Sequence, residues 1–228
     1  NKDGNWYPTK KGISLTPNTV PDVIEGILKA MEVMGYGEKW KPMFINHKHK
    51  FIFIHIPKNA GTSIRNSFEL EGYDQKVAKK RYPHDPSSKI RKYCGEESWN
   101  TFFKFAIVRN PYDRLVSYYH FHKSPQYNYP ARANTFEFDE WIDRGLDSNM
   151  RKTQTWYLDE NIDYIGRYEN LHLDWEIICD NIGIEPYKLP NYNVSNHKEW
   201  EMYYNKDTKK VVNKIFQDDF EQFRYDLL

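Results

Sequence analysis

The chain has 228 residues, enough to bury one sizeable hydrophobic core, which favours a single domain over residues 1–228. No apolar run approaches the ~20 residues of a membrane span, and a formal net charge of +1 argues against general nucleic-acid binding. Two cysteines, Cys94 and Cys179, supply neither a disulfide framework nor a set of metal ligands.

The first fifty residues precede the clearest motifs, and we expect them to form an N-terminal arm followed by a helix. The helix is expected over 21–34, because apolar residues recur on one face between Pro21 and Gly35. Asn1 is not an initiator methionine, so the sequence leaves open a signal or anchor ahead of it.

The segment 51–63, FIFIHIPKNAGTS, joins an apolar run to a glycine-containing loop and a helix start. The run predicts a buried strand over 51–56, and the residues after the loop predict a helix over 62–70. The first N–H groups of a helix lack intrahelical partners and carry partial positive charge. The pattern therefore indicates an anion-binding loop.

The polar residues of this loop suit a phosphate-like anion. Lys58 at the strand end can reach a bridging oxygen, while Thr62 and Ser63 can donate hydroxyl hydrogen bonds to non-bridging oxygens. Lys58 precedes Gly61 and no Gly-Lys-Ser/Thr occurs, so the loop departs from the Walker pattern. The alternative is an ordinary strand–turn–helix joint with a surface lysine.

The segment 103–117, FKFAIVRNPYDRLVS, repeats this order of strand, polar break and helix. It predicts a strand over 103–108 and a helix over 111–122, with a proline in the first helical turn. Arg109 at the strand end and Ser117 two turns into the helix can both approach a second phosphate. A buried arginine bracing the helix cap is the alternative.

Two charged residues in the same motif suit a structural role. We expect Asp113 and Arg114 to form surface or helix-flanking ion pairs rather than to contact a ligand.

The later part of the chain continues the alternation of strands and helices. A third strand is expected over 163–168, ending near Tyr168. Further helices are expected over 136–144, 170–182 and 207–217. This order predicts an α/β fold with a mainly parallel sheet flanked by helices. Ligands bind at the carboxyl ends of such strands, where Lys58, Arg109 and Tyr168 fall.

Taken together, these motifs resemble the sulfotransferases, most closely the carbohydrate type that includes uronosyl 2-O-sulfotransferases and their short bacterial relatives. IPKNAGTS is similar to their loop for the 5′-phosphosulfate, and VRNPYDRLVSYY to their 3′-phosphate segment. The resemblance covers residues 51–225 and includes softer matches: QTWYL, DYIGRYENL, LPNYNVSNHKEW and the terminal VVNKIFQDDFEQFRY. It implies a P-loop-like sulfotransferase fold with 51–225 as its core and 1–50 as an N-terminal arm and helix.

The resemblance implies that the donor is 3′-phosphoadenosine 5′-phosphosulfate, that adenosine 3′,5′-bisphosphate is the product, and that no metal is required. Lys58 would neutralise the leaving phosphate oxygen, and Arg109 with Ser117 would hold the 3′-phosphate. The residues that would hold the 5′-phosphate are Lys58, Asn59, Ala60, Gly61, Thr62 and Ser63. Three further matching positions are Tyr168 for the adenine and Ser195 and Lys198 in a late loop over the nucleotide.

A general base is expected as well, because an acceptor hydroxyl must lose its proton as its bond to sulfur forms. His84 in KKRYPHD is the first candidate. The family places a histidine between the two phosphate motifs, and this segment supplies only that one. A surface histidine in a basic loop is the alternative.

The expected acceptor is a hydroxyl, or alternatively an amine, of a glycan or another small molecule. An anionic acceptor would suit the basic residues flanking His84, although a solvated charged face is the more common explanation of such a cluster. These residues are Lys76, Lys79, Lys80, Arg81, Lys89, Arg91 and Lys92. The loop 123–135 offers Tyr127, Tyr129 and Arg132 as an acceptor lip, or is merely a polar surface loop.

Two other functions remain open at this point. One is a small-molecule P-loop kinase that uses Mg-ATP, although its Gly-Lys-Ser/Thr loop is missing. The other is a non-catalytic nucleotide- or glycan-binding module of the same fold. Localisation follows the source: cytoplasmic if bacterial, or the Golgi lumen if this is a trimmed eukaryotic enzyme.

Overall fold

The computed structural model describes residues 45–69, 84–124, 136–189 and 198–228, which all belong to one compact unit. The expected helix over 21–34, the basic residues 76–81 and the proposed acceptor lip therefore lie outside the described residues. Within the described ranges, no helix is both long enough and apolar enough to cross a membrane.

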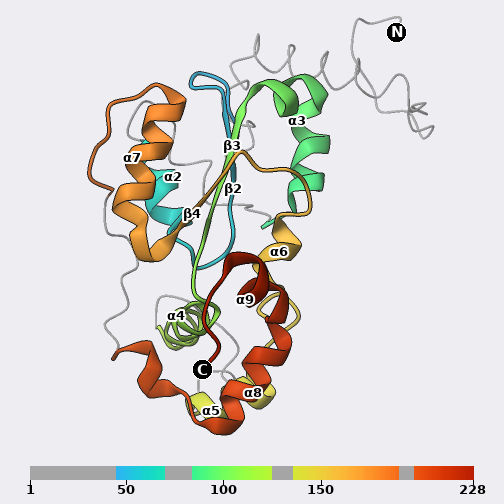
Figure 1. Ribbon diagram of the computed structural model, residues 1–228, viewed down its shortest axis with the longest axis vertical. Helices are drawn as coiled ribbons and strands as arrows, with labels where there is room; N and C mark the ends of the chain where they lie inside the picture. Colours follow the sequence, from blue (N-terminus) through green and yellow to red (C-terminus); the bar gives the residue numbers. More distant parts are fainter. Residues whose placement is uncertain (1–44, 70–83, 125–135, 190–197) are drawn as a thin grey trace, which may run out of the picture. The chain divides into compact units, whose positions relative to one another are not determined.

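A four-stranded sheet lies at the centre of the fold, in the order β1-β2-β3-β4 (Figure 1). Strand β2 (Phe51–Ile54) pairs in parallel with β3 (Phe103–Val108), which pairs in parallel with β4 (Tyr164–Arg167). The short β1 (Ile45–Asn46) is antiparallel to β2 and was not predicted. The predicted α/β fold with a mainly parallel sheet is confirmed.

Alternate residues of the central strands feed two separate cores, as strand geometry requires. One face packs on α2 (Gly61–Glu69) and α7 (Leu171–Ile182), with Phe53 and Phe105 stacked at 5.0 Å between ring centroids. The other face packs on α3 (Ser87–Thr101), as Figure 1 shows. Both faces of β2 and β3 are covered, which accounts for their almost continuous apolar sequence.

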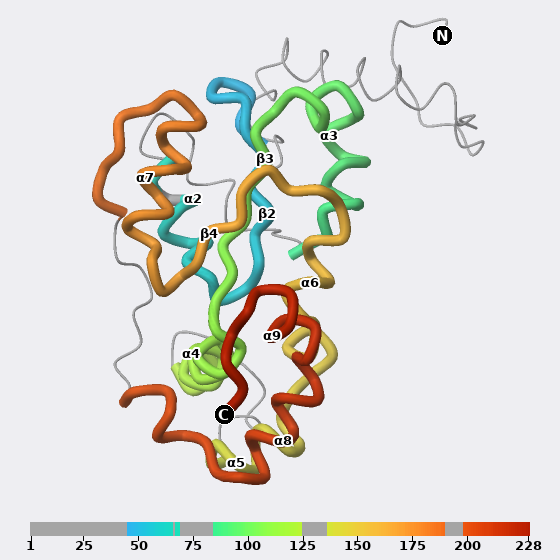
Figure 2. Tube along the Cα trace, viewed as in Figure 1, coloured from blue at the N-terminus to red at the C-terminus, as the bar shows by residue number. Residues whose placement is uncertain are grey.

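A third core lies beyond the ends of the strands, where α4 (Pro111–Lys123) meets the C-terminal helices (Figure 2). It is strongly aromatic, with Tyr112 stacked on Trp200 at 5.5 Å. Much of the 17% aromatic content therefore serves packing. The elements around α4 are α5 (Phe138–Glu140), the π-helical η1 (Trp141–Gly145), the 3₁₀ turn η3 (Trp200–Tyr203), α8 (Lys206–Ile215) and α9 (Gln217–Phe223).

Several boundaries differ from those expected. Helix α3 was missed because its sequence is polar, buries few residues and contains Gly95 at a left-handed φ of 78°. The helix expected over 136–144 is the short α5 followed by η1, and the one expected over 207–217 divides at Phe216 into α8 and α9. Strand β3 has its expected bounds, whereas β2 ends at Ile54 and β4 at Arg167, two residues and one residue before the expected ends. The predicted loops still follow these strands.

Candidate active site

The loop after β2 is held in an unusual backbone conformation. Lys58 and Ala60 both have left-handed φ angles, 71° and 58°, although neither is glycine. Such conformations cost about 1–3 kcal/mol each and persist where the surrounding structure imposes them, often at ligand sites. Helix α2 starts directly afterwards at Gly61, and its first regular bond runs from Ile64 N–H to Ala60 O at 3.1 Å.

Gly61 is required by a close approach rather than by its backbone angles. A Cβ at this position would lie 1.8 Å from Nε2 of His55. The His55 side chain is buried, and its ring meets that of His84 edge to face at 4.6 Å between centroids. Burial, together with neighbouring positive groups, holds the pKa of His55 well below its usual value. A neutral imidazole thus packs against the start of α2.

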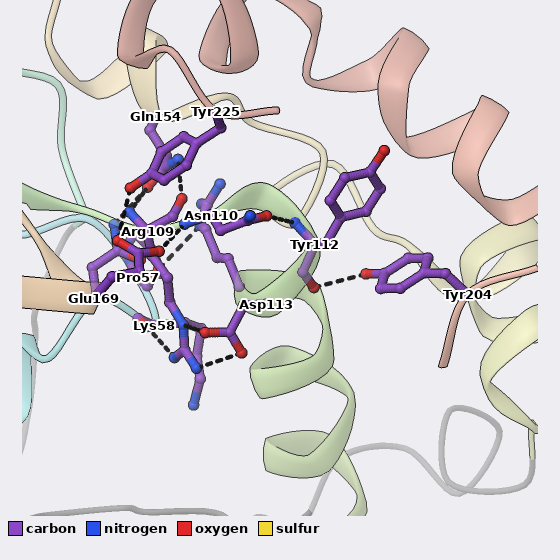
Figure 3. Close-up of polar contacts among 12 residues, drawn as sticks. Pro57, Lys58, Arg109, Asn110, Tyr112, Asp113, Gln154, Glu169, Tyr204 and Tyr225 are labelled. Carbon is purple, nitrogen blue, oxygen red and sulfur yellow. Dashed lines mark hydrogen bonds and ion pairs between the residues drawn. The ribbon is translucent and has the colours of Figure 1, made fainter. Parts of the chain in front are cut away.

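Arg109 at the end of β3 is held by several partners (Figure 3). Its Nε and Nη2 each donate to one oxygen of Asp113 at 2.8 Å, and its Nη1 donates to the Lys58 carbonyl at 3.0 Å. The guanidinium also lies over the ring of Tyr168, 3.9 Å from its centroid. Tyr168 belongs to the 3₁₀ turn η2 (Tyr168–Asn170) after β4, so three strand ends meet here.

Gln154, the first residue of α6 (Gln154–Tyr157), joins the two predicted phosphate loops. Its Oε1 accepts from Asn59 Nδ2 at 2.7 Å and from Arg109 N–H at 2.8 Å, and its Nε2 donates to Arg109 O at 2.8 Å. The side chain is fully buried, and Figure 3 shows it reaching Arg109. One carboxamide therefore fixes the distance between the loop after β2 and the loop after β3.

Gln154 is itself anchored from the C-terminal helices. The carboxylate of Asp219 accepts from the backbone N–H groups of Gln154 and Thr155 at 2.8 and 2.9 Å. Asp219 is fully buried, and this burial raises its pKa although Arg114 and these hydrogen bonds act in the opposite direction. Helix α9 thereby positions a residue of the site that lies 65 residues earlier in the chain.

The loop between β3 and α4 is also held by Glu169, which lies in η2 directly after β4. Glu169 accepts from Asn110 N–H at 2.6 Å and from the hydroxyl of Tyr225 at 3.0 Å (Figure 3). The C-terminal segment is thereby tied to the loop that carries Arg109.

Lys58 lies beside α4, with Nζ 3.9 Å from the ring centroid of Phe121. Burial lowers the pKa of Lys58 to about 7, and the positive charge of Arg109 adds to this effect. Near neutral pH the amine is therefore charged in only part of the molecules. A bound anion beside Nζ would favour the charged form, so the binding of an anion there would be accompanied by proton uptake.

His84 occupies a defined position before α3. Its Nδ1 lies 3.2 Å from the carbonyl oxygen of His55, and because a carbonyl only accepts, Nδ1 carries the proton and Nε2 keeps its lone pair. Partial burial lowers the pKa of His84, aided by Arg114 and opposed by the bond to His55. Asp159 fixes the start of α3 by accepting from Ser87 Oγ at 2.7 Å and Ser88 N–H at 2.8 Å.

The remaining residues predicted for the site differ in how far they are buried. Ser63 and Ser117 are buried on α2 and α4, and Thr62 is half-buried. The side chain of Asn59 bonds to Gln154 and to Ile107 O, which leaves its backbone N–H as the group that could meet an anion. Lys198 is exposed, whereas Ser195 lies outside the described residues.

The expectation for Arg114 was wrong, whereas the helix-flanking ion pair expected for Asp113 is confirmed. Arg114 is buried, and its Nε and Nη1 donate to the carbonyls of Pro57 and Lys152 at 3.2 and 3.1 Å. Asp113 pairs with Arg109, and both side chains are largely buried. Sequence spacing could have suggested the second contact, because the two residues are four apart at a helix start. Gln154 was also missed as a site residue, and only its place in the QTWYL match pointed to it.

No group of three His, Cys, Asp or Glu side chains in the described ranges could hold a metal ion. The expected metal independence is left to experiment.

The bonds of Gln154 predict the effect of removing them. Gln154→Leu leaves the backbone N–H and C=O of Arg109 buried without partners, and each such group costs about 1–3 kcal/mol. Urea denaturation should therefore show a loss of several kcal/mol in the free energy of unfolding. Gln217→Leu, at an exposed position on α9, is the control and should change it by less than about 0.5 kcal/mol. Equal small effects in both variants would refute the joining role of Gln154.

Two proteins are similar to this chain in sequence. "Carbohydrate sulfotransferase 10" of Xenopus laevis is 24% identical over 240 aligned positions, covering 80% of this chain and 67% of that protein. An uncharacterized protein of Archaeoglobus fulgidus is 27% identical over 99 residues, covering 43% of this chain and 82% of that protein. No solved structure matches the chain with significance.

A family model matches a similar share of the chain. Residues 41–226 match the Sulfotransferase family, and this range includes both predicted phosphate loops, Gln154 and Asp219. The resemblance noted from the motifs is thereby confirmed, and the chain belongs to the sulfotransferase family.

Proposed function

We propose that this protein transfers the sulfuryl group of 3′-phosphoadenosine 5′-phosphosulfate to a hydroxyl, or alternatively an amine, of a carbohydrate or another small acceptor. The observation that carries the proposal is that the Gln154 side chain connects the cationic loops after β2 and β3 through hydrogen bonds. Lys58 and Arg109 lie at the ends of adjacent parallel strands, and their loops share three hydrogen bonds with one buried side chain. A nucleotide with phosphates at both the 5′ and 3′ positions matches two such loops.

Each end of the donor has candidate contacts. The loop amides up to Ser63 and the start of α2 would hold the 5′-phosphate, with Lys58 beside the leaving oxygen. Arg109 and Ser117 would hold the 3′-phosphate. One face of the Tyr168 ring is taken by Arg109, so an adenine contact would use its other face or its edge. Ser195 and Lys198 stay candidates for the nucleotide cover.

The residues present suit sulfuryl transfer, in which charge passes to the leaving phosphate oxygen as the donor supplies its sulfuryl group. Lys58 would stabilise that charge, and the rigid loops would hold the reacting atoms in line. His84 would accept the acceptor proton at Nε2, which its bond from Nδ1 to His55 O leaves unprotonated in the neutral ring.

A sugar acceptor has support near His84. The positive charge of Lys152 helps to lower the pKa of His84, after the larger effect of burial, and Lys152 Nζ stands 4.0 Å above the ring of Trp156. Trp156 is 40% exposed, and an exposed indole next to a cation suits a sugar ring. The relative named as a carbohydrate sulfotransferase agrees with this choice.

The donor is tested by calorimetric binding of adenosine 3′,5′-bisphosphate in the absence of metal, compared with Mg-ATP. We expect the bisphosphate to bind more tightly, and Arg109→Ala to weaken it by at least about tenfold, because charged hydrogen bonds contribute about 1.5–3 kcal/mol. Arg144→Ala, at an exposed arginine of η1, is the control and should bind as the wild type does. A preference for Mg-ATP would instead favour a kinase.

Lys58 predicts proton uptake on binding. At about pH 8 the free amine is mostly neutral, since its pKa is about 7, and nucleotide phosphates are already ionised. Bisphosphate binding should raise this pKa and take up close to one proton, measured by calorimetry in buffers of different ionisation enthalpy. Lys58→Arg carries its positive charge at this pH even without a ligand, so this variant should take up no proton on binding. Uptake that persists in Lys58→Arg would assign the proton to another group.

His84 predicts a loss of turnover with binding retained. In Asn the amide nitrogen can replace Nδ1 and keep the bond to His55 O, while nothing replaces Nε2. His84→Asn should therefore lower kcat by about 100-fold or more with little change in bisphosphate affinity. In the wild type, kcat should fall as pH drops through the His84 pKa, which lies below 6.5, because the ring then becomes protonated. An unchanged acid limb in His84→Asn would exclude His84 as the base.

A further inference from the structure

The orientation of Arg109 is set by an acidic residue, Asp113, to which the proposed reaction assigns no step. Asp113 lies in the first turn of α4, four residues after Arg109, and its two oxygens accept from Nε and Nη2 at 2.8 Å each. The two side chains are only 7% and 13% exposed, so water screens this pair weakly. The Tyr168 ring fixes the plane of the guanidinium from one side.

This arrangement leaves a defined part of Arg109 for a ligand. A guanidinium has five N–H donors. Among the described residues three of these donors are used, two by Asp113 and one by the Lys58 carbonyl, so one N–H on Nη1 and one on Nη2 have no partner within that part of the chain. These two atoms form the end of the guanidinium, which is the geometry that binds two oxygens of one phosphate.

We propose that Asp113 is a positioning residue that aims this end of Arg109 and thereby makes the site selective for a nucleotide with a second phosphate. The inference rests on the proposed function, because it takes the 3′-phosphate as the ligand of Arg109. A flexible arginine loses side-chain entropy when it binds an anion. The pair with Asp113 already restricts the Arg109 side chain in the free protein, so less entropy is lost on binding.

A competing role of Asp113 can be distinguished from a positioning role by the direction in which anion affinity changes when its charge is removed. If Asp113 only competed with the phosphate for Arg109, removing its negative charge would tighten the binding of an anion. If Asp113 positions Arg109, removing the charge weakens binding, although the site becomes more positive. The two roles therefore predict changes in opposite directions.

The test measures the affinity ratio of adenosine 3′,5′-bisphosphate to adenosine 5′-monophosphate by calorimetry. For Asp113→Asn we expect this ratio to fall by at least about tenfold while monophosphate affinity stays within about twofold. Asp113→Glu keeps the carboxylate and should recover part of the ratio. Asp143→Asn, an exposed acid in η1, is the control and should leave the ratio unchanged.

A double variant links the effect to Arg109. In the Arg109→Ala background, Asp113→Asn should cause no further fall in the ratio. A tighter bisphosphate complex in Asp113→Asn, an equal loss of both nucleotides, or a full additional loss without Arg109 would each overturn the proposal. A wild type without preference for the bisphosphate would refute the proposed function itself, and that result appears before any variant is made.

Discussion

The rest of the site depends on the three hydrogen bonds of the Gln154 side chain. Its oxygen accepts from Asn59 and from the Arg109 amide, and its nitrogen donates to the Arg109 carbonyl, all within 2.8 Å. Because the group is fully buried, any bond left unmade would cost more than a made bond contributes. Separating the two loops would therefore break bonds of a fully buried group. Asp219 extends the constraint to α9, so the C-terminal helices take part in shaping the site.

The same hydrogen bonds hold the loop after β2 in a strained backbone conformation and keep the Lys58 amine in a buried place that disfavours its charge. Lys58 and Ala60 have left-handed backbone angles, and the Lys58 amine has a pKa lowered by burial and by Arg109. Two cationic side chains are thus kept near each other before any ligand arrives, one over Phe121 and the other on Asp113 and Tyr168. Preorganisation of this kind costs folding stability, and under the proposed function that cost would be recovered as binding energy for the donor phosphates.

The sequence predicted those parts of the site that depend on neighbours along the chain. Strands β2 and β3, the loops after them and the positions of Lys58 and Arg109 follow from local patterns of apolar and polar residues. The role of Gln154 could not be predicted, because its partners lie 45 and 95 residues away. Arg114 was misjudged for a related reason: its partners are backbone carbonyls, which leave no trace in the sequence. Helix α3 escaped because Gly95 interrupts a polar segment with few buried residues.

The most direct measurement is a crystal structure of the complex with adenosine 3′,5′-bisphosphate. We expect the 5′-phosphate on the N–H groups at the start of α2 with Lys58 beside it. The 3′-phosphate should accept from Nη1 and Nη2 of Arg109 while Asp113 keeps its two bonds. A nucleotide bound elsewhere, or one whose phosphates contact neither the α2 start nor Arg109, would contradict the assignment of these two loops as the donor site.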